Sequence, residues 1–124
     1  FAGQEIGFTL LFSNTGGFEN MAMIRNEFPE TAPFESSVPP PSRVDPAGLW
    51  VEWDLLDLPT GYQNSIDVTV MISSTLQPSI TIEIWDGIFD HTGTLRDWVI
   101  ILFHVEPPPY HYVYLPLVLR NYTP

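Results

Sequence analysis

Alternation of apolar and polar residues is the pattern that most limits what this chain can fold into. The stretch EIGFTLLFSN, residues 5–14, is the clearest case, because apolar side chains recur at every second position. They are Ile6, Phe8, Leu10 and Phe12. Alternate side chains share one face of a strand, so the stretch predicts a strand with one buried face. With 13 prolines and 8 glycines in 124 residues, which favour turns over helices, the pattern predicts an all-β protein.

The alternation recurs along the chain and predicts six strands in all. The other five are Glu19–Asn26, Trp50–Leu55, Ser65–Ser73, Ser79–Trp85 and Asp97–Val105. Residues 14–17, NTGG, supply a turn after the first strand, because asparagine and glycine adopt positive φ at little cost. Short strands with turns between them predict a two-sheet β-sandwich of immunoglobulin type, incomplete by one strand.

Three segments add detail to this prediction. Pro29–Pro46 holds six prolines, too many missing amide donors for a central strand, so we expect a loop or a sheet edge. Asp86–Thr94 is acidic and holds two glycines, and it predicts a loop. Asp97–Val105 is apolar on both faces, which predicts a central strand.

The charge of the chain excludes two classes of partner. Its 15 acidic residues outnumber four arginines, with no lysine, and the net charge is −11. Phosphate backbones and anionic membranes repel such a chain, and no apolar run approaches the roughly 20 residues of a membrane helix. We therefore expect no nucleic-acid binding and no membrane insertion. There is no cysteine to form a disulfide. Phe1 in place of methionine suggests a removed leader or precursor, so we expect an extracellular or cell-surface protein.

The order of turns and strands between residues 3 and 73 is a further feature. Gly3-Gln4-Glu5 precedes the strand Phe8–Ser13 and the turn Asn14-Thr15-Gly16. Later come Phe28-Pro29, Trp50–Leu55, Leu58-Pro59-Thr60-Gly61 and Ser65–Ser73. This order resembles the immunoglobulin-like conserved repeat domain of bacterial cell-surface proteins. The resemblance implies a structural or adhesive module and carries no catalytic residues to this chain.

The same resemblance implies one missing strand and one added strand. Members of that family carry a strand ahead of the Gly-Gln turn, whereas this sequence starts two residues before Gly3. The closing YLPLVLRN, residues 114–121, has no counterpart and resembles C-terminal tails of some secreted bacterial proteins. We therefore expect a sandwich over 1–106, a polyproline linker over 107–109 and a strand for another molecule over 110–124.

This donor strand is expected to fill the vacant groove of the next copy, giving a homopolymer joined head to tail. Its contact residues are predicted to be Tyr112, Val113, Tyr114, Leu115, Pro116, Leu117, Val118 and Leu119. The predicted acceptor groove consists of Ile6, Phe8, Leu10, Phe12, Trp98, Ile100 and Leu102. The proline run favours extended geometry and no glycine follows Gly93, so the tail is expected to point away from its own domain. One alternative is a tail that folds back as the last strand of its own chain, at a lower entropic cost. Another is a flexible tail that some other partner orders.

Other chemistry has weaker support in the sequence. Asp86 and Asp90 are calcium candidates in a glycine-bearing loop, although the spacing of a calcium-binding loop is missing. His104 and Glu106 share one face of a strand but lack a third metal ligand. No nucleophile elbow or phosphate-binding loop occurs, so we expect no enzyme and no cofactor.

The tryptophans keep a different function open, that of a carbohydrate-binding or adhesive module with its tail folded on its own domain. Trp50 and Trp85 have the outward parity of their strands, and aromatic faces stack on sugar rings. The competing interpretation is that they cover core edges or subunit contacts.

Overall fold

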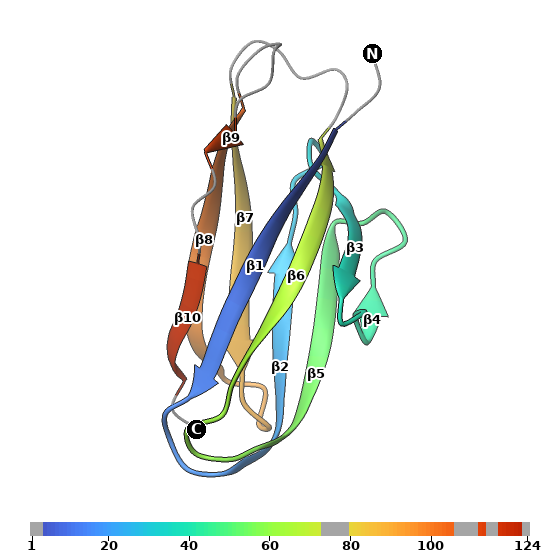
Figure 1. Ribbon diagram of the computed structural model, residues 1–124. Helices are drawn as coiled ribbons and strands as arrows, with labels where there is room; N and C mark the ends of the chain where they lie inside the picture. Colours follow the sequence, from blue (N-terminus) through green and yellow to red (C-terminus); the bar gives the residue numbers. More distant parts are fainter. Residues whose placement is uncertain (1–3, 73–79, 106–111, 114–116, 123–124) are drawn as a thin grey trace.

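Two sheets pack face to face in the computed structural model, which describes residues 4–72, 80–105, 112–113 and 117–122 (Figure 1). The four-stranded sheet has the order β10 (Leu117–Tyr122), β1 (Gln4–Asn14), β6 (Gln63–Ile72) and β3 (Phe34–Val38). The six-stranded sheet has the order β4 (Arg43–Val44), β5 (Trp50–Leu58), β2 (Glu19–Glu27), β7 (Ile80–Phe89), β8 (Leu95–Val105) and β9 (Tyr112–Val113). The described residues form strands and turns without a helix, which confirms the predicted all-β sandwich. The immunoglobulin type stays a prediction.

Alternation places the core between the sheets, as the sequence predicts. In β1 the four apolar side chains of the even positions are at most 5% exposed. β6 runs antiparallel to β1, with Phe8 opposite Val68 and Leu10 opposite Ile66. From the other sheet, Trp53, Ile84 and Phe103 meet them in one apolar cluster. Each fully buried side chain of this size contributes about 1.5–3 kcal/mol to folding, so this cluster is the main source of stability.

The proline-rich segment forms the outer strands of both sheets. β3 is the last strand of the four-stranded sheet, and the two-residue β4 is the last strand of the six-stranded sheet. Proline lacks the amide donor that an inner strand needs, so such a segment fits only at an edge. The prediction of a loop or an edge is confirmed for Pro29–Pro46.

Strand β7 continues four residues further than the sequence predicted. Residues 86–89 pair with β8, where Asp86 lies opposite Val99. Only Asp90–Thr94 forms the turn, in which Gly93 has φ of 80°. The predicted loop Asp86–Thr94 is therefore wrong in its first half, because backbone pairing on both sides of β7 extends the strand despite a carboxylate that faces the core.

Strand β8 has apolar side chains on both faces but is not a fully central strand. β7 covers one of its edges, whereas β9 pairs only with His104 and Val105 on the other edge. The core side of β8 carries Val99, Ile101 and Phe103. The apolar residues of its other face are therefore available for contacts outside the core.

Candidate functional site

The edge of β1 is the first candidate site, because it receives the C-terminal strand. β10 runs parallel to β1, with Leu10 opposite Leu117 and Phe12 opposite Leu119. The register shifts after Phe12, and Asn14 lies opposite Tyr122. β10 also lies close to β8, so it occupies the side of the sandwich where the two sheets meet (Figure 1). Backbone groups along an open strand edge bind a further strand readily.

Two strands of the structure, β9 and β10, fall within the predicted donor strand. Tyr112 and Val113 form β9 and pair with the end of β8. Tyr114, Leu115 and Pro116 lie outside the described residues. Leu117, Val118 and Leu119 form the part of β10 that pairs with β1. This contact lies within one chain, as in the alternative of a tail folded on its own domain, and pairing with a second copy stays a prediction.

The tail returns to its own sandwich instead of pointing away from it. β9 is antiparallel to β8, with Val105 opposite Tyr112, so the chain reverses direction between these two residues. The sequence interpretation took the absence of glycine as a bar to reversal. Six residues separate the paired positions, which is long enough to reverse without a tight glycine turn, and closure within one chain has a low entropic cost.

The predicted acceptor groove mixes two faces of the molecule. Ile6, Phe8, Leu10 and Phe12 lie in the core. Trp98, Ile100 and Leu102 lie on the outer face of the six-stranded sheet and are 54%, 38% and 37% exposed. These three residues therefore do not line a groove with β1. The prediction assigned the even positions of β8 to the core side, because the strand is apolar on both faces and its sequence does not show which face is buried.

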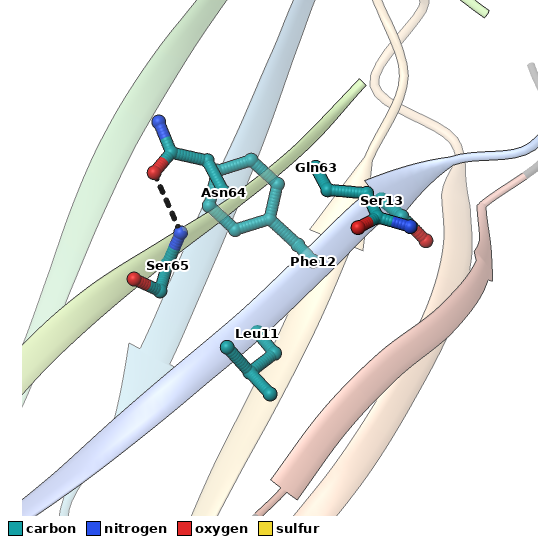
Figure 2. Close-up of a pocket in the computed structure, with 6 residues that line it drawn as sticks. All are labelled: Leu11, Phe12, Ser13, Gln63, Asn64 and Ser65. Carbon is teal, nitrogen blue, oxygen red and sulfur yellow. Dashed lines mark hydrogen bonds between the residues drawn. The ribbon is translucent and has the colours of Figure 1, made fainter. Parts of the chain in front are cut away.

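Two shallow hollows lie along the outer surface of β1 and β6. One has a volume of about 350 Å³ and is lined by Leu11, Phe12, Ser13, Gln63, Asn64 and Ser65 (Figure 2). The other has a volume of about 420 Å³ and lies over Gly7, where Thr9 donates a 2.8 Å hydrogen bond to Asp67. The described residues that line the two hollows include one carboxylate, Asp67, and no histidine.

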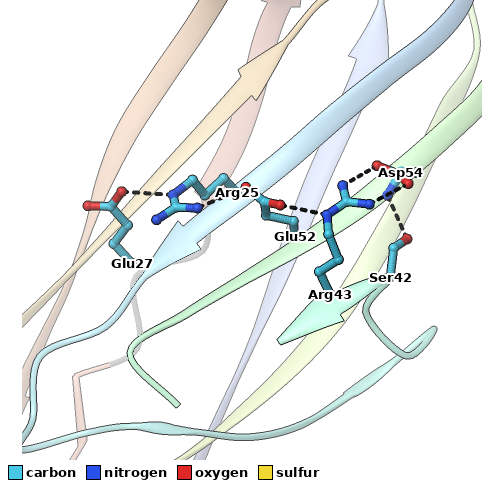
Figure 3. Close-up of polar contacts among 6 residues, drawn as sticks. All are labelled: Arg25, Glu27, Ser42, Arg43, Glu52 and Asp54. Carbon is cyan, nitrogen blue, oxygen red and sulfur yellow. Dashed lines mark hydrogen bonds and ion pairs between the residues drawn. The ribbon is translucent and has the colours of Figure 1, made fainter. Parts of the chain in front are cut away.

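An ion-pair ladder crosses the outer face of β2, β5 and β4 (Figure 3). Arg25 donates to Glu27 at 2.9 Å and to Glu52 at 2.8 Å. Arg43 donates to the other oxygen of Glu52 at 2.7 Å and holds Asp54 in a two-pronged contact. Opposite charges alternate along the ladder, so the sheet surface is polar here without a strong local field.

Glu52 and Asp54 are held as carboxylates by this ladder. Burial opposes the ionisation of Glu52, but hydrogen bonds from Arg43 and Arg25 outweigh it and lower the pKa of Glu52. The hydrogen bond from Arg43 is the main cause of the lowered pKa of Asp54. A carboxylate whose pKa is lowered holds its proton less readily, so these contacts disfavour the protonated form that a general acid needs.

The outer face of β7 and β8 is aromatic. Trp85 is half-buried and its ring centre lies 6.3 Å from that of Phe89. Trp98 is opposite Gly87 in the next strand. Trp50, the other predicted outward tryptophan, is half-buried, with the Arg25 guanidinium 4.8 Å from the centre of its ring. The sequence interpretation named Trp50 and Trp85 but missed Trp98, because it assigned Trp98 to the core side of β8.

The calcium candidates lie in different environments. Asp86 is fully buried, and its two carboxylate oxygens make no hydrogen bond. Asp90 accepts hydrogen bonds from the hydroxyl and amide of Thr92 and from the amide of Thr94, which lower the pKa of Asp90. Within the described part of the chain, no three acidic, histidine or cysteine side chains come together to hold a metal ion, and no helix is long and apolar enough to cross a membrane.

The turn after β7 is held to β2 by a polar contact that the sequence did not reveal. Nδ1 of His91 donates to Oε1 of Glu19 at 2.8 Å. The Glu19 side chain is 1% exposed, whereas that of His91 is 55% exposed. A buried carboxylate needs a partner, so this contact stabilises the end of the sandwich where β2 begins.

Replacing His91 by alanine is expected to lower the free energy of unfolding by about 1–2 kcal/mol, because Glu19 loses its side-chain partner. Urea unfolding followed by tryptophan fluorescence measures this change. In the Glu19→Gln background the same substitution should cost less than half as much. Equal costs in both backgrounds would show that the contact contributes nothing to stability.

Comparison of the chain with protein-family models, with curated proteins and with solved structures finds no match. The resemblance to the immunoglobulin-like repeat domain of bacterial surface proteins therefore stays a prediction.

Proposed function

We propose that the protein is a non-enzymatic structural subunit that joins copies of itself into an extracellular fibre or surface layer by exchanging its C-terminal strand. One observation carries the proposal: Leu117–Tyr122 pairs in parallel with the edge of β1. This strand is the last described element of the chain and ends the order of its sheet. The same backbone pairs can therefore form with β1 of a second copy while the rest of the sandwich keeps its fold.

β10 can pair with β1 of its own chain, which we call closure, or with β1 of another copy, which we call exchange. Both arrangements use the same backbone pairs, so the linker before β9 determines which one is favoured. A strand tethered by a flexible linker has an effective concentration of order mM near its own β1, so dilute protein closes on itself. Three consecutive prolines, 107–109, favour an extended linker and reduce this advantage. Exchange between copies should therefore dominate where subunits are concentrated, as on a cell surface.

Charge regulates the same balance. Each copy carries a net charge of −11, which keeps free subunits apart and soluble. The Debye length falls from about 10 Å at 0.1 M salt to about 3 Å at 1 M salt, so added salt weakens this repulsion. Assembly by strand exchange should accordingly increase with salt.

Cysteine pairs can distinguish exchange from closure, because the natural chain has no cysteine. Leu11 and Val118 are paired in register, and the distance between paired strands suits a disulfide. One preparation carries Leu11→Cys and the other carries Val118→Cys. After the two are mixed at high concentration and oxidised, we expect a cross-linked species of two chains on a denaturing gel. Its yield should rise with protein concentration and with salt.

The matched control mixes Val118→Cys with Leu56→Cys, which places an exposed cysteine on β5 of the other sheet. This mixture should give only background cross-linking. A chain that carries both Leu11→Cys and Val118→Cys reports closure as a link within one chain. If this internal link forms fully while the mixture of single variants stays uncross-linked at every concentration, the protein is a closed monomer and the proposal is wrong.

A further inference from the structure

A row of flat side chains crosses the outer face of the six-stranded sheet. It starts at Trp50 on β5, continues with Arg25 on β2, and reaches Trp85 on β7 and Trp98 on β8. Three steps between adjacent strands span roughly 14 Å. The row therefore runs across the strands and is long enough to contact an extended ligand.

Gly87 allows the ring of Trp85 to lie flat on the sheet. A methyl group at Gly87 would overlap the outer ring carbons of Trp85, with Cζ2 at 2.8 Å and Cζ3 at 2.9 Å. Any other residue would therefore force this ring away from the strand. Gly87 also lies between Arg25 and Trp98 in the pairing of β2, β7 and β8, so the Trp85 ring covers the centre of the row.

Trp98 is exposed without a role in the core. Its side chain is 54% exposed, while its neighbours Val99 and Ile101 supply the core contacts of β8. We call Trp85, Gly87 and Trp98 the tryptophan shelf.

Polar groups border the shelf on one side. Glu27 lies opposite Trp85 in the pairing of β2 and β7, and its side chain is 52% exposed. Arg25 lies opposite Gly87 and stays 28% exposed while it holds Glu27 and Glu52. Sugar rings present an apolar face for stacking and hydroxyls at their rim, and a flat aromatic surface beside fixed hydrogen-bonding groups matches both. We infer that the tryptophan shelf binds an uncharged glycan chain.

Several classes of ligand stack on aromatic rings, and the charge of the protein favours uncharged glycans among them. Nucleic acid and acidic glycans are repelled by a net charge of −11. A cationic ligand would meet the Arg25 guanidinium in the middle of the row. A neutral polysaccharide has none of these costs. Its binding does not use the pairing of β10 with β1, because these two strands belong to the other sheet.

Native affinity electrophoresis tests the site, because this acidic protein migrates well without denaturant. The gels contain hydroxyethyl cellulose, xylan, galactomannan, laminarin or dextran, and a separate gel contains heparin. We expect retardation by at least one neutral polysaccharide and none by heparin. Trp98→Ala should weaken the binding about tenfold. Gly87→Ala should weaken it as well, because the added methyl displaces the Trp85 ring from the sheet.

Leu56→Ala is the matched control, since Leu56 is 66% exposed on β5 of the same sheet but lies away from the shelf. It should bind like the natural protein. The inference is wrong if none of the five polysaccharides retards the protein, if Trp98→Ala binds as well as the natural protein, or if heparin binds more strongly than the neutral chains. It is also wrong if Trp98→Ala reduces self-association in sedimentation velocity without affecting sugar binding.

Discussion

Replacing Asp86 by valine is expected to raise the free energy of unfolding at neutral pH by about 1–4 kcal/mol. Asp86 is fully buried in β7, and neither of its carboxylate oxygens makes a hydrogen bond. Asn26, opposite it on β2, is equally buried and also lacks a side-chain partner. Valine has a similar volume, favours strands and continues the apolar series of Ile84 and Ile88, so the substitution removes a polar cost without leaving a cavity.

The gain should depend on pH, and the sign follows from the direction of the pKa shift. Burial raises the pKa of Asp86 well above its usual value, and the nearby charge of Asp97 adds to the effect. The folded protein therefore holds a proton that the unfolded chain has released, and Asp86 makes the protein less stable as pH rises from about 4 towards the raised pKa. Asp86→Val removes this decline, so the difference from the natural protein should be small near pH 4 and grow with pH.

Glu83→Val provides the control for this experiment. It replaces an acidic side chain by valine at an exposed position of the same strand, so its effect should be small and nearly independent of pH. Chemical unfolding between pH 4 and pH 8 measures both variants. If Asp86→Val is less stable than the natural protein by more than about 1 kcal/mol, Asp86 has a favourable partner in the folded protein and the argument fails.

Alternation predicted the sandwich because it reports directly which face of a strand is buried. The apolar even positions of β1 and of β6 lie in the core as expected, and the proline-rich segment lies at sheet edges. In each case one local rule determines the outcome. A strand with one apolar face has one stable orientation, and a proline excludes an inner position.

The predictions from the sequence were wrong where a segment fits two structures equally well, or where a residue type favours a structure that the fold does not adopt. β8 is apolar at odd and even positions, so parity could not show that Ile101 faces the core and Trp98 faces outwards. Asp86 suggested a loop, although pairing with both neighbouring strands extends β7 through it. The return of the tail depends on a contact between β1 and β10 that is distant in sequence, and local turn chemistry does not report on such contacts.

Asn14 is another case. Its residue type correctly indicated a turn, but the sequence did not show how Asn14 stabilises that turn. The sequence interpretation assigned Asn14 to a turn through positive φ, yet in the described residues only Asp57, among those other than glycine, has positive φ. Asn14 is the last residue of β1 and uses its side chain instead. Its Nδ2 donates to the carbonyls of Gly17 and Leu58 at 2.8 and 2.9 Å, and its Oδ1 accepts from the amide of Gly16 at 3.0 Å.

Replacing Asn14 by aspartate is therefore expected to lower the free energy of unfolding by roughly 3 kcal/mol at neutral pH. The side chain is almost fully buried, and the substitution turns a donor into a second acceptor that faces two carbonyl oxygens. A carboxyl in this position should be protonated more readily than in the unfolded chain, so the loss should shrink as pH falls towards 4. Because Asn14 lies opposite Tyr122, the substitution should also weaken the pairing of β10 with β1.

Asn64→Asp is the matched control, because it makes the same chemical change at an exposed position one strand away. It should change the free energy of unfolding by less than about 0.5 kcal/mol. Urea unfolding at pH 7 and at pH 4 compares the two variants. A loss for Asn14→Asp that is no larger than that of the control would mean that the three side-chain hydrogen bonds do not hold this end of the sandwich together. A large loss that does not change with pH would instead assign the effect to the lost donor alone, and would contradict the expected rise in the pKa of the new carboxyl.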